Sequence, residues 1–133
     1  MLSASLAFAQ FRRGGGYYRR PAFATLKDFD GGFQFCRIAF SQNRAGDGGG
    51  WAVDYPRADE NLSARLAEVT RVTIGRDTRG RPRHMVVTAS DPDLGLCPFV
   101  MMTEPGGAYF DRDEAEGLRA YLLKGGFLWA DDF

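Results

Sequence analysis

Histidine and cysteine are scarce in this chain. Its 133 residues include one histidine, His84, and two cysteines, Cys36 and Cys97, with no CxxC spacing. Structural zinc sites take four ligands, mostly Cys and His, so this composition argues against a zinc centre. Cys36 and Cys97 both adjoin apolar runs, which favours two buried free thiols. A disulfide between them is the alternative if the protein is exported.

The chain also lacks a surplus of positive charge. It has 17 Lys and Arg against 17 Asp and Glu. A nucleic-acid-binding domain needs extra cations to displace counterions from phosphates, so no nucleic-acid partner is expected. The charges are unevenly placed, because residues 10–27 contain five basic residues and no acid. The leading arm is therefore basic, and the body of the chain is mildly acidic.

Long apolar runs are missing as well. No segment approaches the roughly 18 apolar residues of a membrane span, so no transmembrane segment is expected in this chain. The first ten residues are mostly small or apolar, and Ala7-Phe8-Ala9 fits the A-x-A pattern of a signal-peptidase site. Residues 1–9 are interpreted as a signal-peptide remnant, with a disordered tail as the alternative. The protein is expected to be exported, and periplasmic or membrane-associated through partners.

The rest of the chain has room for one domain. Residues 10–30 are rich in Gly, Arg and Tyr and show no period that would bury a face, which is typical of a flexible lead-in. Residues 31–133 are the α/β domain, with order expected from about Phe33.

Within that domain, apolar strand-forming runs alternate with helical patterns. Strands are expected at residues 33–40, 72–74, 85–89, 98–102 and 127–130. A one-turn helix is expected after Asp91, where Pro92 follows a capping residue. This alternation is typical of βαβ units, and it predicts an open, doubly wound, mostly parallel sheet.

Two longer helices are expected between the strands. Over about 58–70, apolar residues fall at i, i+4 and i+7, with Asp54 or Asp59 as the N-cap. A capping box begins the second helix, and its apolar face is expected at i, i+3 and i+7. The residues that define these patterns are Leu62, Leu66 and Val69 for the first helix, and Asp111, Glu114, Ala115, Leu118 and Leu122 for the second.

Candidate functional residues follow the strands, because open α/β sheets bind ligands beyond the carboxyl ends of their strands. The resulting acidic and aromatic rim is Trp51, Asp54, Tyr55, Glu104, Asp131 and Asp132. These side chains are candidates for ligand binding. The alternatives are that the two aromatic residues pack their loop onto the core and that the glutamate is only a turn residue.

Asp131 and Asp132 are adjacent carboxylates. They suit a hard divalent cation, or general acid and base chemistry if proximity raises one pKa. The alternative is that one of them caps a helix. No organic cofactor is identified, because the glycine loop at residues 46–50 lacks both G-x-G-x-x-G and a P-loop lysine. That loop is interpreted as mobile rather than as a phosphate site.

Arg37 is a charge inside an apolar strand run, so it needs a carboxylate partner if it is buried. Asp54 and Asp131 are the candidates. A Ser/His/Asp triad finds little support, since no serine lies in a nucleophile-elbow context.

Four stretches, in order, carry a family resemblance. They are Asp-Gly-Gly-Phe-Gln-Phe-Cys-Arg at 30–37, Gly-Trp-Ala-Val-Asp-Tyr-Pro-Arg-Ala-Asp at 50–59, Asp-Pro-Asp-Leu at 91–94 with Pro-Phe at 98–99, and the segment 122–133 that ends in Asp-Asp-Phe. Together, over about a hundred residues, they resemble the domain-of-unknown-function family 4159.

The resemblance implies a relationship to class I glutamine amidotransferase-like and trehalose-utilisation-like α/β domains, hence a flavodoxin-like or amidotransferase-like sheet. It also implies von Willebrand A-type membrane proteins as partners. Family domains continue past the Asp-Asp-Phe motif, so this chain is expected to be incomplete at its C-terminus. The amidotransferases place a nucleophilic cysteine where this chain has Asp131 and Asp132, so their chemistry is not expected here.

The leading functional hypothesis is therefore a non-catalytic, ligand- or partner-binding α/β domain of an exported bacterial protein. The alternative is a hydrolase or transferase that uses the acidic rim of Glu104, Asp131 and Asp132, with or without a divalent metal.

Overall fold

Four parallel strands form the main sheet. The structure, a computed structural model, describes residue 21 and residues 23–131. Within this part, the strands lie in the order β3-β1-β4-β6, and a separate antiparallel pair joins β2 to β5. The strands are β1 (Phe35–Ala39), β2 (Ser41–Gln42), β3 (His84–Thr88), β4 (Phe99–Thr103), β5 (Ala108–Tyr109) and β6 (Leu128–Asp131).

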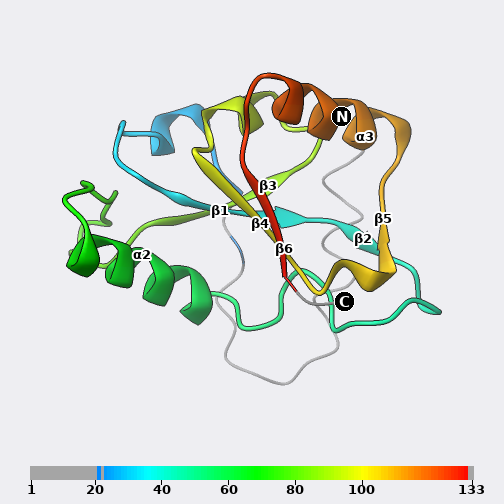
Figure 1. Ribbon diagram of the computed structural model, residues 1–133, viewed down its shortest axis with the longest axis horizontal. Coiled ribbons are helices and arrows are strands. Elements are labelled where there is room, and N and C mark those ends of the chain that lie inside the picture. Colours follow the sequence, from blue (N-terminus) through cyan, green and yellow to red (C-terminus); the bar gives the residue numbers. More distant parts are fainter. Residues whose placement is uncertain (1–20, 22, 132–133) are drawn as a thin grey trace.

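Two helices cover opposite faces of this sheet. In Figure 1, α2 (Arg57–Val69) lies at the lower left and α3 (Arg112–Leu123) at the upper right, with the strands between them. Arg37 of β1 bonds to α2, and side chains alternate along a strand, so Cys36 points to the other face. There Cys36 is bonded to Cys97, whose carbonyl contacts Tyr121 of α3. The expected doubly wound α/β sheet is confirmed.

The core sits on both faces of the central strands. Phe35, Ile38, Val86, Val87 and Val100 are all completely buried. Strands covered on both faces read as continuous apolar runs, which is why the strand predictions for β1, β3 and β4 are confirmed. Burying each such side chain stabilises the fold by about 1.5–3 kcal/mol.

Short 3₁₀ helices and caps complete the connections. They are η2 (Leu26–Asp28), η3 (Pro92–Leu96) and η4 (Pro105–Gly107). The Asp91 side chain caps η3 by accepting from the backbone N–H of Asp93, at 2.9 Å. The predicted capping box is also present, since Glu114 N–H donates to Asp111 at 2.8 Å and Asp111 N–H donates to Glu114 at 3.0 Å.

The N-terminus of α2 differs from the prediction. Its N-cap is Pro56, and no side chain caps it, so the assignment of Asp54 or Asp59 as the cap is wrong. Val69 is 78% exposed and is not part of a core stripe. The buried positions of α2 are polar, namely Asp59 and Ser63, one turn apart. The ion pair of Asp59 with Arg37 therefore joins the helix to the sheet, whereas the prediction placed only apolar residues on the face toward the core.

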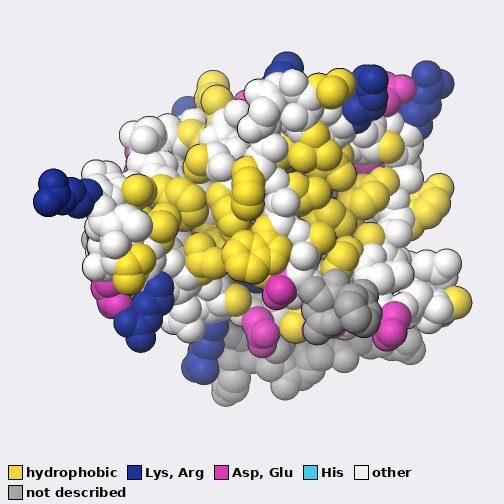
Figure 2. All heavy atoms as spheres, viewed as in Figure 1, with side chains coloured by type: hydrophobic (Ala, Val, Ile, Leu, Met, Phe, Trp, Pro, Cys, Tyr) yellow, Lys and Arg dark blue, Asp and Glu magenta, His cyan; other side chains and the backbone are white. Residues whose placement is uncertain are grey.

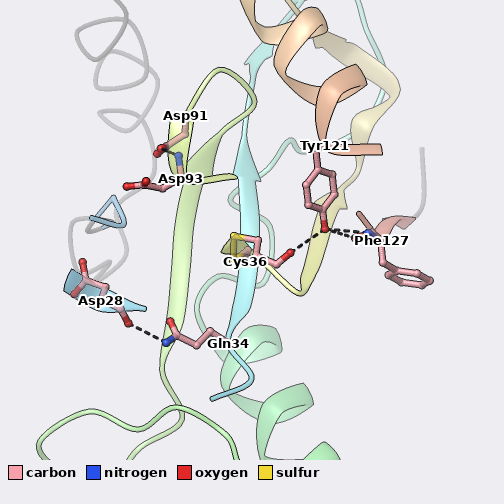
Figure 3. The surroundings of a disulfide bond; sticks show 8 residues. Asp28, Gln34, Cys36, Asp91, Asp93, Tyr121 and Phe127 are labelled. Atoms are coloured by element: carbon pink, nitrogen blue, oxygen red, sulfur yellow. Dashed lines mark hydrogen bonds between the residues drawn. A yellow bond between two sulfur atoms is a disulfide. The ribbon is translucent and has the colours of Figure 1, made fainter. Parts of the chain in front are cut away.

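In α3 the buried residues lie one position before those that were predicted. Ala115 and Leu122 are exposed, whereas Glu114 and Tyr121 are buried. The Tyr121 hydroxyl accepts from Phe127 N–H at 3.0 Å and lies 3.1 Å from the Cys97 carbonyl oxygen (Figure 3). This contact orients the helix and places Tyr121 inward in place of its leucine neighbour.

Cys36 and Cys97 form a disulfide, so the preference for free thiols was wrong. Their Cα atoms are 5.9 Å apart (Figure 3). Cys36 lies in β1, and Cys97 lies just before the neighbouring strand β4. Sheet pairing therefore brings together two cysteines separated by 61 positions in the sequence.

The described structure also begins earlier than expected. Ala24 N–H donates to the Val86 carbonyl at 2.9 Å, and Phe23 forms a parallel bridge with Val86. Order therefore does not start at Phe33. The signal-peptide assignment at residues 1–9 and the basic segment at 10–20 lie outside the described residues. In the part that is described, no helix is long and apolar enough to cross a bilayer.

Candidate functional site at the carboxyl edge of the sheet

The strand order places a switch point between β1 and β4. The chain leaves β1 for β3 on one side, and it leaves β4 for β6 on the other. Ligands in open α/β sheets bind beyond the carboxyl ends of the strands at such a point. Two loops meet there, residues 40–56 after β1 and residues 104–107 after β4. They contain most of the residues predicted for the site.

A buried arginine fastens the first loop to the sheet. Arg37 donates to Asp59 through Nε and Nη2, and both side chains are completely buried. Its Nη1 lies 2.9 Å from the Trp51 carbonyl oxygen, 3.0 Å from that of Val53 and 2.6 Å from Thr103 Oγ1. One guanidinium therefore joins β1 to α2, to the loop and to β4.

The predicted partners of Arg37 are wrong. Asp54 and Asp131 are both exposed, and the buried carboxylate belongs to Asp59. Burial raises the pKa of the Asp59 carboxyl, and the hydrogen bonds from Arg37 act in the opposite direction. Asp59 was missed because it was assigned to the helix cap. Asp59 lies one turn before Ser63, the other buried residue of α2.

Glu104 ties the second loop to the first. Its backbone is left-handed, with φ of 47°. Its carboxylate accepts a hydrogen bond from the Gly49 N–H. One further bond joins the two loops, from Asn43 N–H to the Gly107 carbonyl at 2.7 Å, and Gln42 Nε2 donates to the Gly48 carbonyl at 2.7 Å within the first loop. The two loops at the switch point are thus hydrogen-bonded to each other.

Close backbone approach explains one glycine of this loop. A Cβ on Gly46 would lie 2.3 Å from the Gly107 Cα, closer than any real Cβ contact. The loop therefore packs directly on η4. The sequence pattern indicated a glycine loop, but it did not indicate that the loop is hydrogen-bonded at this end.

Three aspartates are exposed around these loops, Asp47 and Asp54 on the first loop and Asp131 at the end of β6, and Arg44 is exposed on the first loop as well. We call the three aspartates the acidic loop surface. The Asp131 carbonyl accepts from Glu104 N–H at 2.8 Å, which places the end of β6 beside the η4 loop. Figure 2 shows acidic side chains, with Lys and Arg side chains among them, in the lower part of the view. Asp132 lies outside the described residues.

In the described part of the chain, the fold brings together no cluster of side chains that supports the predicted metal site. Among residues 21 and 23–131, no group of three or more His, Cys, Asp or Glu side chains is arranged to hold a metal ion. Glu104, one of the predicted acids, directs its carboxylate to a backbone N–H. The pairing of Asp131 with Asp132 stays a prediction.

The two aromatic residues of the predicted rim point inward. Trp51 and Tyr55 are 5% and 6% exposed and belong to the core cluster. Tyr55 OH lies 3.2 Å from His84 Nε2, and burial lowers the pKa of His84. This burial supports the alternative in which both aromatic residues pack the loop onto the core.

Comparison with known proteins gives one family. The family profile described as "Domain of unknown function (DUF4159)" matches residues 35–133, which is most of the chain and nearly all of the described fold. No curated protein and no solved structure matches the chain. With the parallel sheet, the switch-point loops and this match together, the chain belongs to the family of domains of unknown function DUF4159.

Proposed function

We propose that this chain is a non-catalytic binding domain of an exported bacterial protein, and that it binds a protein partner through the acidic loop surface. The observation that supports this most is that hydrogen bonds hold the loops at the switch point in place. Arg37 and Glu104 use their charged groups to hold the loops in place. A carboxylate bonded to a backbone N–H is poorly placed to act on a substrate, whereas fixed loops suit recognition.

The charge of the surface indicates the kind of partner. Asp47 and Asp54 are exposed on the loop that Arg37 and Glu104 hold by hydrogen bonds, and Asp131 is exposed at the end of β6. A partner surface with Lys and Arg residues complements such a rim, and exposed charges of this kind chiefly raise the association rate. The resemblance found in the sequence suggests a von Willebrand A-type membrane protein as that partner, in a periplasmic setting.

The amidotransferase-like and flavodoxin-like relationship belongs to the same proposal. The switch-point position of the loops is what such a relationship implies. With Asp131 where those proteins place a cysteine, and with Cys36 and Cys97 joined in a disulfide, we infer that this domain retains the scaffold of those proteins without their chemistry.

The test is a binding measurement with a purified von Willebrand A-type domain from the source bacterium. The double variant Asp47→Asn/Asp54→Asn removes two charges while keeping the side-chain acceptor at 47, and Asn tolerates the positive φ at 54. Association should slow by roughly tenfold and lose most of its salt dependence.

Glu68→Gln is the matched control. Glu68 is an exposed acid near the C-terminal end of α2, at the opposite edge of the sheet. This variant should bind like the wild type. Equal binding by the wild type and the double variant would refute the acidic loop surface as the binding site.

A further inference from the structure

A cavity of about 380 Å³ lies at the amino ends of β1 and β4. Gln34 and Pro98, which directly precede these two parallel strands, both line it. The cavity is therefore at the opposite edge of the sheet from the acidic loop surface. Its other lining residues come from η2, from the loop after η2 and from the end of η3, and they are Leu26, Phe29, Gly31, Gly32 and Leu96. Its volume lies in the range of about 300–1,000 Å³ that is typical of small-ligand sites.

The walls of this cavity are largely apolar. Leu26 is 64% exposed and Leu96 is 46% exposed, although both are leucines. Phe29 is partly buried and packs against the core cluster. Exposed leucines that line one hollow present apolar surface that a bound molecule removes from water. The first requirement on the occupant is therefore an apolar body.

Gln34 adds an unpaired acceptor to the lining. This residue is 1% exposed, and its Nε2 donates to the Asp28 carbonyl oxygen and to Asp30 Oδ1, both at 2.9 Å. Figure 3 shows the carboxamide of Gln34 turned toward Asp28, at the end of η2. The other polar atom of the carboxamide, Oε1, has no hydrogen-bond partner in the described part of the chain.

The contacts of Nε2 establish which end of the carboxamide is the oxygen. Both groups that Nε2 contacts are acceptors, so exchanging the two ends would place oxygen against oxygen. The Asp28 carbonyl also accepts from Arg83 Nη1 at 2.9 Å, which holds this acceptor in place. A buried acceptor without a partner is unfavourable, so Gln34 Oε1 calls for a donor. Oε1 is itself buried, and because the last torsion of a glutamine is soft, a small rotation turns it toward a donor in the cavity.

We propose that this cavity binds a small, neutral, mainly apolar ligand that carries one N–H or O–H group, and that Gln34 Oε1 accepts from that group. The ligand is neutral because a charge buried against the apolar walls would be unfavourable. A water molecule would satisfy Oε1 but would leave these walls hydrated. Most of the lining residues precede residue 35, where the family match begins, so the family profile does not cover this site.

The test is an NMR titration of the isotope-labelled chain with indole and with benzofuran. The two probes have nearly the same size and shape, but benzofuran has an ether oxygen where indole has its N–H. Both should shift the amide signals of Gly31 and Gly32, and indole should bind about tenfold more tightly because it makes one more hydrogen bond. Wild-type protein that binds neither probe at these glycines, or that binds benzofuran as tightly as indole, would overturn the proposal.

A variant of Gln34 tests the role of its acceptor. Gln34→Met keeps a side chain of similar length and removes Oε1, so indole should bind this variant only as tightly as benzofuran does. Methionine also lacks the bonds to Asp28 and Asp30, so the circular dichroism spectrum is compared with that of the wild type. A folded Gln34→Met protein that still prefers indole would overturn the assignment of Oε1.

A second pair of variants tests the location without altering Gln34. Leu96→Asp places a charge in the wall of the cavity and should weaken both probes by at least about tenfold. Leu122→Asp is the matched control, because Leu122 is 45% exposed, lies on α3 and does not line the cavity. This control should bind both probes like the wild type. If Leu96→Asp binds them like the wild type as well, the probes bind elsewhere and the proposal is wrong.

Discussion

Arg37, in the middle of β1, donates from Nε to both carboxylate oxygens of Asp59 on α2, at 3.0 and 3.2 Å. Neither side chain is exposed. The Nη1 nitrogen of Arg37 donates to the carbonyl oxygens of Trp51 and Val53, in the loop that follows β1. The ion pair therefore fixes a helix and, through the same guanidinium, the loop at the switch point.

Removing one member of this pair should be costly. Asp59→Asn leaves the Arg37 charge buried without its counterion, and we expect a loss of about 3–5 kcal/mol in the free energy of unfolding. Urea denaturation measures this. Glu68→Gln breaks an exposed pair with Arg65 and should cost less than about 1 kcal/mol. If the two variants lose similar stability, Arg37 is satisfied without Asp59.

The same helix shows where sequence reasoning fell short. Leu62, Leu66 and Val69 follow a helical period, and the helix they predicted is present. Periodicity of apolar residues cannot indicate that Asp59 and Ser63 occupy the buried positions, because the need for them comes from Arg37 on a distant strand. The charge at Arg37 did predict a buried carboxylate. Choosing among the aspartates required the three-dimensional arrangement.

The Cys36–Cys97 disulfide should contribute strongly to stability. It closes a loop across 61 positions of the sequence, and in the chain-entropy description such a loop contributes about 4 kcal/mol. The double variant Cys36→Ala/Cys97→Ala should lose most of that in a urea titration. Reductant should shift the wild-type midpoint and leave the variant unchanged. A variant as stable as the wild type would contradict this.

Strand positions were predictable because they depend on the local sequence, whereas the disulfide depends on the order of the strands. Residues 85–89 and 98–102 are continuous apolar runs, and both became strands buried on two faces. Whether two cysteines meet depends on strand order. In that order β4 and β3 lie on opposite sides of β1, and this depends on tertiary packing and cannot be predicted from a local sequence pattern.

His84 should make stability depend on pH. Burial lowers its pKa below the ordinary value of 6.5, so the unfolded chain takes up a proton at a higher pH than the folded one. Stability is then highest above pH 6.5 and falls as the pH drops through that value toward the folded pKa. The melting temperature should decrease over this window.

The control uses the fact that His84 is the only histidine of the chain. In His84→Gln the slope of melting temperature against pH should decrease between about pH 5 and 7, because His84 is the only side chain whose ordinary pKa lies in that range. An unchanged slope in this variant would assign the dependence to another group.

Divalent cations separate the binding proposal from the enzyme alternative. Because Glu104 is bonded to Gly49, we expect Mg²⁺ or Ca²⁺ to leave the melting temperature unchanged. Asp131→Asn, at an exposed position, should alter stability by less than about 0.5 kcal/mol. A rise in melting temperature with metal that Asp131→Asn abolishes would instead support a metal site at the acidic rim.

The most direct measurement is amide hydrogen exchange at Gly49. If the Glu104 carboxylate fastens the glycine loop, this amide is protected in the wild type. Glu104→Ala should then speed its exchange by roughly 10- to 100-fold, the equivalent of a hydrogen bond to a charged group. Glu104→Gln keeps an acceptor and should retain most of the protection. A Gly49 amide that exchanges freely in the wild type, or at the same rate in Glu104→Ala, would show that the carboxylate is free at the switch point and contradict a pre-formed binding surface.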